Sequence, residues 1–152
     1  MHPYGEIRTA TAHDAAELAR LLTELGHPTT ADGIAALWKP WAAAGNSALV
    51  VPRADGTLAG AVTLHQMTVL HRPTPVGRIT ALVVDAPARG QGIGRALVAA
   101  AEAAFVQSGC KLLEVTSHMR LADAHAFYEH LGYERTSQRF AKTLVPAPRQ
   151  ES

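Results

Sequence analysis

The chain has 152 residues, of which 47% are hydrophobic and 18% charged, and its formal net charge is +1. That length favours one domain with a substantial core, and the nearly neutral charge argues against nucleic acid as a partner. The single cysteine, Cys110, leaves no basis for a disulfide framework or a thiolate zinc site. No apolar run is long enough to span a membrane and residues 1–6 do not resemble a signal peptide, so we expect a cytoplasmic protein without a membrane partner.

The first half of the chain predicts two helices and three strands. Asp14 and Glu17 have the spacing of a capping box, and Thr30 or Asp32 would cap the second helix. Pro40 lies inside that second helical pattern and predicts a break or kink. The strands are expected at residues 6–12, 46–52 and 58–70, and the helices at 14–25 and 30–44.

The second half begins with an apolar, β-branched strand at residues 76–84, followed by a glycine-rich turn. The further elements expected are a helix at 93–107, a strand at 111–116, a helix at 122–131, and a final strand or hairpin half at 133–144. We expect a single mixed α/β domain over residues 1–145 and a disordered tail at 146–152.

The turn from strand to helix contains Gly90, Gly92 and Gly94. Glycines let a backbone approach a ligand closely, and the first amides of a helix have no intrahelical partner. The turn has neither the glycine spacing of a dinucleotide fingerprint nor the lysine of a P-loop. It therefore predicts a site for the phosphates of a large cofactor, with a tight turn that binds no ligand as the alternative.

Arg89-Gly90-Gln91-Gly92-Ile93-Gly94 resembles the acyl-CoA signature of the GNAT N-acetyltransferase superfamily. A second block, residues 124–133, resembles another conserved block of that family, and the resemblance is strongest over 76–144. It implies an α/β GNAT fold, with a mixed central sheet of six to seven strands, splayed between strands 4 and 5, and about four helices. A narrower resemblance, to the branch that includes aminoalkylphosphonate acetyltransferases, is carried by Ser117, Arg120, His125, Phe127 and Tyr128.

The resemblance implies acetyl-CoA as the acetyl donor. The pantetheine arm would lie in the splay beside the backbone of Leu82 and Val84, and the amide of Val83 would stabilise the oxyanion. The residues implied in binding acetyl-CoA are Leu82, Val83, Val84, Arg89, Gly90, Gln91, Gly92, Ile93, Gly94, Arg95, Ser117, Arg120, Ala124, Phe127 and Tyr128.

Tyr128 occupies the general-acid position of the family, and its alternative is an amphipathic core residue. The family's glutamate base corresponds to Arg78, which cannot act as a base. The base is therefore expected to be His65 or His71, or a water relay, unless the amine arrives neutral. Arg78, His71 and Trp38 are the residues expected to contact the acceptor, although packing against the sheet is the alternative for Trp38.

The function expected is transfer of acetyl from acetyl-CoA to a primary amine of a small molecule, in which Arg78 would pair with an anionic group. The alternatives are acetylation of a protein N-terminus or lysine, a non-catalytic acyl-CoA sensor, and a nucleotide site. The spacings of the eight histidines do not support a metal site. Many family members form homodimers, and the resemblance implies the same assembly as an option here.

Overall fold

The computed structural model describes residues 3–116, 122–137 and 139–144. It divides the chain into two compact units, residues 1–116 and 117–152. The expected single domain over 1–145 stays a prediction, and the tail at 146–152 lies outside the described residues.

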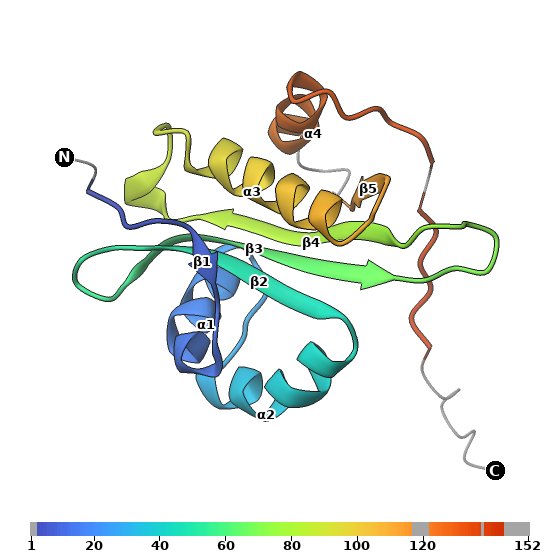
Figure 1. Ribbon diagram of the computed structural model, residues 1–152. Helices are drawn as coiled ribbons and strands as arrows, with labels where there is room; N and C mark the ends of the chain where they lie inside the picture. Colours follow the sequence, from blue (N-terminus) through green and yellow to red (C-terminus); the bar gives the residue numbers. More distant parts are fainter. Residues whose placement is uncertain (1–2, 117–121, 138, 145–152) are drawn as a thin grey trace, which may run out of the picture. The chain divides into compact units, whose positions relative to one another are not determined.

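The first unit is built on a five-stranded sheet with the order β1-β2-β3-β4-β5 (Figure 1). Neighbouring strands are antiparallel except β4 and β5, which are parallel. The bounds of β2 and β4 are those expected from the sequence, whereas the other three strands are shorter than expected. The strands are β1 (Arg8–Thr9), β2 (Asn46–Pro52), β3 (Leu58–Met67), β4 (Val76–Val84) and β5 (Leu112–Val115).

Helices cover both faces of this sheet (Figure 1). The face under α1 (Ala15–Glu24) and α2 (Ala31–Ala43), the α1/α2 face, contributes Val50, Ala61 and Val83 to a core cluster with Leu18 and Leu21 of α1. The opposite face, the α3 face, packs against α3 (Ile93–Gln107), which has the expected bounds. Two short 3-10 helices, η1 (Ala12–Asp14) and η2 (Ala86–Ala88), precede α1 and α3.

Two predictions about the first helices need correction. The capping box lies one turn earlier than expected, between Thr11 and Asp14 of η1, because Glu17 instead accepts hydrogen bonds from Arg20 and the backbone of Leu58. Pro40 does not end α2. It lies on the exposed side in the last turn, and its own carbonyl still accepts a bond from the amide of residue 44.

The second unit contains α4 (Ala122–His130), which is followed by Gly132 in the left-handed conformation that the sequence predicts for a helix end. The final strand expected at 133–144 is wrong: residues 133–137 and 139–144 form no strand. The described residues therefore hold five strands rather than six to seven. Among the described helices, none has the length and apolar character needed to cross a membrane.

Candidate active site

The glycine turn leaves a row of amides unpaired at the start of α3. Gly90 and Gly92 have φ of +79° and +82°, which only glycine adopts without strain, and a Cβ at either would meet nothing within 4 Å. In the described part of the chain, the amides of residues 90–95 have no hydrogen-bond acceptor; the first amide of the helix with a partner is that of Ala96. Unpaired amides at a helix N-terminus bind anions, so the turn fits the phosphates of an acyl-CoA.

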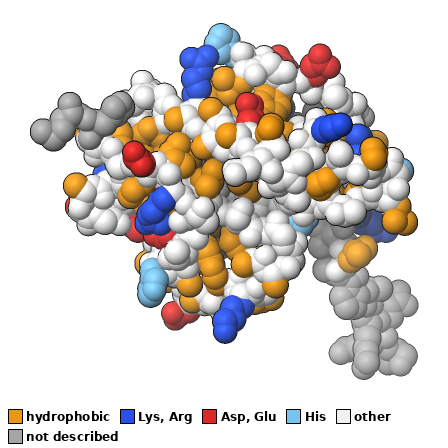
Figure 2. Space-filling view, viewed as in Figure 1, with side chains coloured by type: hydrophobic (Ala, Val, Ile, Leu, Met, Phe, Trp, Pro, Cys, Tyr) orange, Lys and Arg blue, Asp and Glu red, His pale blue; other side chains and the backbone are white. Residues whose placement is uncertain are grey.

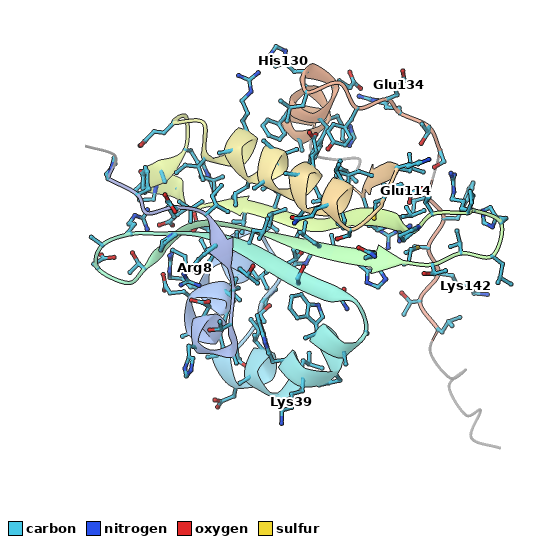
Figure 3. All side chains as sticks on the ribbon, in the orientation of Figure 1. Arg8, Lys39, Glu114, His130, Glu134 and Lys142 are labelled. Atoms are coloured by element: carbon cyan, nitrogen blue, oxygen red, sulfur yellow. The ribbon has the colours of Figure 1, made fainter. Side chains whose placement is uncertain are left out.

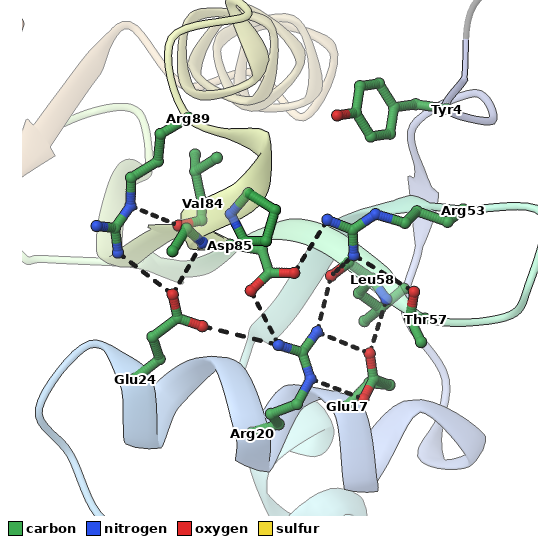
Figure 4. Close-up of polar contacts among 12 residues, drawn as sticks. Tyr4, Glu17, Arg20, Glu24, Arg53, Thr57, Leu58, Val84, Asp85 and Arg89 are labelled. Carbon is green, nitrogen blue, oxygen red and sulfur yellow. Dashed lines mark hydrogen bonds and ion pairs between the residues drawn. The ribbon is translucent and has the colours of Figure 1, made fainter.

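A buried aspartate anchors the strand that leads into this turn. Asp85 follows β4 directly and is 7% exposed, and its two oxygens bind Arg20 at 3.0 Å and Arg53 at 2.9 Å (Figure 4). Burial opposes ionisation, but the two arginines outweigh it and hold the pKa of Asp85 below its ordinary value. Glu17 on α1 holds Arg20 from the other side with two bonds of 2.9 Å. Sequence analysis missed this cluster, whose one signal is a charged residue at the end of an apolar strand.

The side chain of Arg89 is also engaged in this region (Figure 4). Its Nε donates to the carbonyl of Val84 at 3.1 Å, and its Nη2 lies 3.4 Å from Glu24, which also accepts a bond from the amide of Ala86. A phosphate could bind this guanidinium only after it leaves Val84 and Glu24. The backbone amides of the turn are thus the better-exposed donors.

The sheet opens beside β4, as the sequence resemblance implies. β4 and β5 are paired only over Val76–Ile79 and Leu112–Val115, and residues 80–84 have no strand partner on that side among the described residues. The amide of Asp85 donates to the carbonyl of Ala59 in β3. The backbone N–H and C=O groups of successive strand residues point alternately to the two sides of the strand, so this bond fixes the direction of the amides that precede it.

That alternation decides which amides face the opening. Val83 is paired with Ala61 of β3, and its carbonyl faces β3 next to Gly60. The N–H and C=O groups of one residue in an antiparallel strand point to the same side, so the Val83 amide also faces β3 and belongs to the β3–β4 hydrogen-bond ladder. The expectation that the Val83 amide stabilises the oxyanion therefore does not fit the sheet. The backbone groups of Leu82 and Val84 point to the open side, where a pantetheine arm would lie.

A β-bulge in β4 changes which side chains lie on each face just before the opening. Thr63 of β3 is paired with Ala81, and the next residue of β3 is paired with Ile79, which leaves Thr80 as the extra residue. Its hydroxyl lies 2.6 Å from that of Thr63. Regular alternation from Ala81 would put Ile79 on the α1/α2 face; the bulge puts Arg78 there instead.

Arg78 forms a polar row with residues of the neighbouring strands. It is paired with His65 of β3 and with Glu114 of β5, and paired residues share a face. A Cβ on the preceding Gly77 would lie 2.6 Å from Phe105 of α3, so Gly77 faces α3 and Arg78 faces the α1/α2 side. The row ends at β5, where Figure 3 labels Glu114.

The row holds a half-exposed ion pair and two polar atoms without partners. Nη2 of Arg78 donates to Oε2 of Glu114 at 3.0 Å, and the two side chains are 36% and 42% exposed. Nδ1 of His65 and Nε of Arg78 are buried without a hydrogen-bond partner among the described residues. Buried polar atoms without partners are uncommon, and they often mark a place where a ligand or water binds. The sequence pattern indicates His65 and Arg78 but not Glu114, which only the strand register brings next to them.

Trp38 and Trp41 of α2 lie on the same side of the sheet. Their ring centroids are 4.9 Å apart, and both rings are half-buried against the core cluster. Nδ2 of Asn46, the β2 residue paired with His65, donates to the carbonyl of Trp41 at 2.9 Å. The end of α2 is thereby attached to the strand next to the polar row. His71 does not join this row, because it is exposed in the turn between β3 and β4.

The predicted site residues after residue 116 belong to the second unit. Tyr128 makes edge contacts with the rings of Phe127 and Tyr133, and burial raises the pKa of Tyr128 to about 12. Its phenol is therefore protonated at neutral pH, as a general acid must be. Ala124 is half-buried on the same helix. The predictions for Ser117 and Arg120 lie outside the described residues.

Other features of the first unit are distinct from this row. A cavity of about 450 Å³ lies on the α3 side, between the N-terminal segment 3–7 and the glycine turn, where Tyr4 donates to Gln91 at 2.9 Å. Cys110 is buried and free, and burial raises the pKa of its thiol. No group of three or more metal-ligating side chains occurs among the described residues. On the face in Figure 2, basic side chains are interspersed with acidic ones.

Comparisons with known proteins agree with this arrangement. The model of the acetyltransferase (GNAT) family matches residues 14–133. The chain is 35% identical over 148 residues to an aminoalkylphosphonate N-acetyltransferase of Salmonella typhimurium, covering 93% of each protein. It is 32% identical over 135 residues to an aminoglycoside N(6')-acetyltransferase of Stenotrophomonas maltophilia, covering 87% of this chain and 88% of that protein.

Solved structures share the fold. An acetyltransferase of Trypanosoma brucei superposes with a TM-score of 0.81 at 24% identity, covering 91% of this chain and 99% of that one. Glucosamine-6-phosphate N-acetyltransferase from Arabidopsis thaliana gives a TM-score of 0.80 at 19% identity, covering 95% and 100%. The family match, the two relatives and the shared fold agree with the unpaired amides and the opening beside β4: this chain belongs to the GNAT acetyltransferase family.

Proposed function

We propose that this protein transfers an acetyl group from acetyl-CoA directly to a primary amine of a small molecule that carries an anionic group. The observation that carries this proposal is the half-exposed Arg78, which the bulge turns onto the α1/α2 face beside the opening of the sheet. A guanidinium there can bind a phosphonate or carboxylate through two parallel hydrogen bonds. By their names, the two curated relatives described above act on small molecules that carry amines.

The donor would bind through backbone groups of the first unit. The amides of residues 90–95 would take its pyrophosphate, and the backbone of Leu82 and Val84 would pair with its pantetheine arm. An amide of one of these two residues, rather than that of Val83, would then stabilise the oxyanion at the acetyl carbonyl. Direct transfer further requires that the amine be held close and aligned, which is a task of positioning.

Tyr128 is proposed as the general acid that protonates the departing thiolate. Its raised pKa, about 12, keeps the proton on the phenol until the thiolate forms. A thiolate with a reference pKa of about 8.5 is a weaker base than the Tyr128 phenolate. Proton transfer from Tyr128 to the sulfur is therefore favourable only if the phenolate regains a proton at once. A cytoplasmic location and a homodimer stay predictions.

The test of this function is release of free thiol from acetyl-CoA in the presence of single amines. We expect turnover with short amines that carry a phosphonate or carboxylate, and weaker turnover with neutral alkylamines of the same length. Turnover with peptides but not with small amines would contradict the acceptor class. Binding of CoA by calorimetry without thiol release from any amine would favour the acyl-CoA sensor.

A further inference from the structure

We propose that the Arg78–Glu114 ion pair controls the base of the reaction: an anionic acceptor takes Arg78 for itself and thereby frees Glu114 to accept the ammonium proton. This inference rests on the proposed function and adds to it the base, which Arg78 itself cannot supply. It also gives a reason why the enzyme would prefer amines that carry an anionic group.

The strand register places Glu114 where a base is needed. It is paired with Arg78 one position before the β4–β5 pairing ends, so its carboxylate lies beside the opening where the donor's pantetheine arm would lie. It is the one carboxylate in the polar row that His65, Arg78 and Glu114 form across the sheet. At 42% exposure it can be reached by a small molecule.

The ion pair is weak enough to be exchanged. Both side chains are more than a third exposed, and solvent screens such pairs strongly. A single bond joins them, Nη2 to Oε2 at 3.0 Å, which is less than the two parallel bonds that a guanidinium can make with a phosphonate or carboxylate. An acceptor whose anion binds Arg78 in this way can therefore displace Glu114.

While the pair is closed, Oε2 of Glu114 accepts the hydrogen bond from Nη2 of Arg78 and is not free to accept a proton from the acceptor. Displacement of Arg78 frees this oxygen when the acceptor's ammonium arrives at the same row. A further titratable group in the polar row is His65 on β3, which is paired with Arg78 and whose Nδ1 has no hydrogen-bond partner among the described residues. His65 is the competing candidate for the base, and the experiment includes it.

The proton balance is complete without a further reactant. Glu114 accepts one proton from the acceptor's ammonium, and the freed nitrogen lone pair forms the bond to the acetyl carbonyl carbon. The carbon–sulfur bond breaks, and the second proton of the nitrogen replaces the one that Tyr128 gives to the departing sulfur. The proton on Glu114 passes to water when the amide leaves, so one amide, one thiol and one proton are formed.

The experiment measures kcat/KM of the full-length protein for 2-aminoethylphosphonate and for propylamine, an acceptor of similar length without the anionic group. We expect the wild type to prefer the phosphonate by roughly 30-fold or more. In Arg78→Met, kcat/KM for the phosphonate falls and that for propylamine rises, so the preference falls to about threefold or less. A rise with the neutral amine is the decisive result, because a merely structural arginine would not produce it.

A second variant tests the base itself. Glu114→Gln should lower kcat/KM for the phosphonate about 100-fold at pH 7 and that for propylamine much less, because the neutral amine leaves Glu114 paired with Arg78. Activity should return as the pH approaches about 10, where the amine is itself increasingly neutral and needs no base. His65→Gln should leave the acceptor preference as in the wild type. Arg8→Met, which breaks the ion pair between Arg8 of β1 and Asp14 of η1 outside the polar row, should change neither preference nor pH profile.

Three outcomes would overturn the inference. In the first, Arg78→Met lowers kcat/KM for both amines equally. In the second, Glu114→Gln keeps the wild-type pH profile, and in the third, His65→Gln alone shows the recovery at high pH. CoA binding and thermal melting of each variant identify loss of folding, and Glu114→Asp serves as a conservative variant that should retain the pH profile. A wild type that transfers acetyl to neither amine would instead contradict the proposed function.

Discussion

At the scale of single residues, the site depends on ion pairs between side chains of different elements. Asp85 is buried between Arg20 and Arg53, and it ends the strand that leads to the glycine turn. Arg78 and Glu114 form a similar contact in a different setting, because both are half-exposed. Burial makes the first pairing structural, whereas exposure allows the second to be exchanged for a ligand.

Asp85→Asn should destabilise the fold, because it leaves two arginines without their shared carboxylate. We expect a loss of ~2 kcal/mol in the free energy of unfolding at pH 7, measured by urea titration. The pKa of Asp85 is lowered in the folded state, so its contribution is present above the unfolded pKa and is lost as the pH falls through the folded pKa. The difference between the variant and the wild type should therefore shrink below about pH 4.

The control for this prediction is Asp32→Asn, which removes an exposed carboxylate from the first turn of α2. It should cost clearly less stability than Asp85→Asn. Equal losses in the two variants would mean that the arginines around Asp85 contribute nothing specific.

At the scale of elements, the unpaired amides at the start of α3 and the early end of the β4–β5 pairing create the donor site. The unpaired amides were expected from the sequence, because a glycine turn and a following helix are local features with local signals. The early end of the pairing was expected only from the family resemblance. The bulge at Thr80 was not expected, since a register shift depends on the partner strand rather than on the strand's own pattern. It decides that Arg78 rather than Ile79 lies on the α1/α2 face.

Gly92→Ala should weaken CoA binding as well as stability. Gly92 has φ of +82°, so alanine there adds strain of about 1 kcal/mol and distorts the amides of the turn. We expect at least a tenfold loss of CoA affinity by calorimetry, on the order of 1.4 kcal/mol.

Gly109→Ala is the matched control, because Gly109 has φ of +89° at the opposite end of the same helix, with open space around its Cα. It should cost similar stability and leave CoA affinity unchanged. If both variants bind CoA as tightly as the wild type does, the turn is not the donor site.

At the scale of the whole molecule, the family match runs from residue 14 to 133 and so spans both compact units. The donor-binding backbone proposed here belongs to the first unit, and the proposed acid, Tyr128, belongs to the second.

Tyr128→Phe should lower kcat by about 100-fold and leave the affinity for CoA nearly unchanged, since it removes only the proton donor. Because the pKa of Tyr128 is about 12, its deprotonation should not limit the wild-type rate below about pH 11. Single-turnover kinetics and calorimetry measure the two effects. Tyr133→Phe removes a hydroxyl from the ring that contacts Tyr128 and should retain most of the turnover; a fully active Tyr128→Phe would rule out the acid assignment.

The sequence by itself determined the elements whose signals are local. The bounds of β2, β4 and α3 and the glycine turn all follow from patterns within a few residues. The sequence left Thr30 and Asp32 open as the cap of α2, and the structure shows that Thr30 is the cap. The family resemblance further indicated the donor and the place where the sheet opens.

Only the tertiary structure decided which face of the sheet Arg78 lies on and which carboxylate it pairs with. The bulge turned it onto the α1/α2 face, and the parallel register put Glu114 of β5 at 3.0 Å from it, 36 positions away in the chain. The same holds for Arg20 and Asp85, which are 65 positions apart. Such pairs depend on register and packing between distant segments, and no short-range pattern records them.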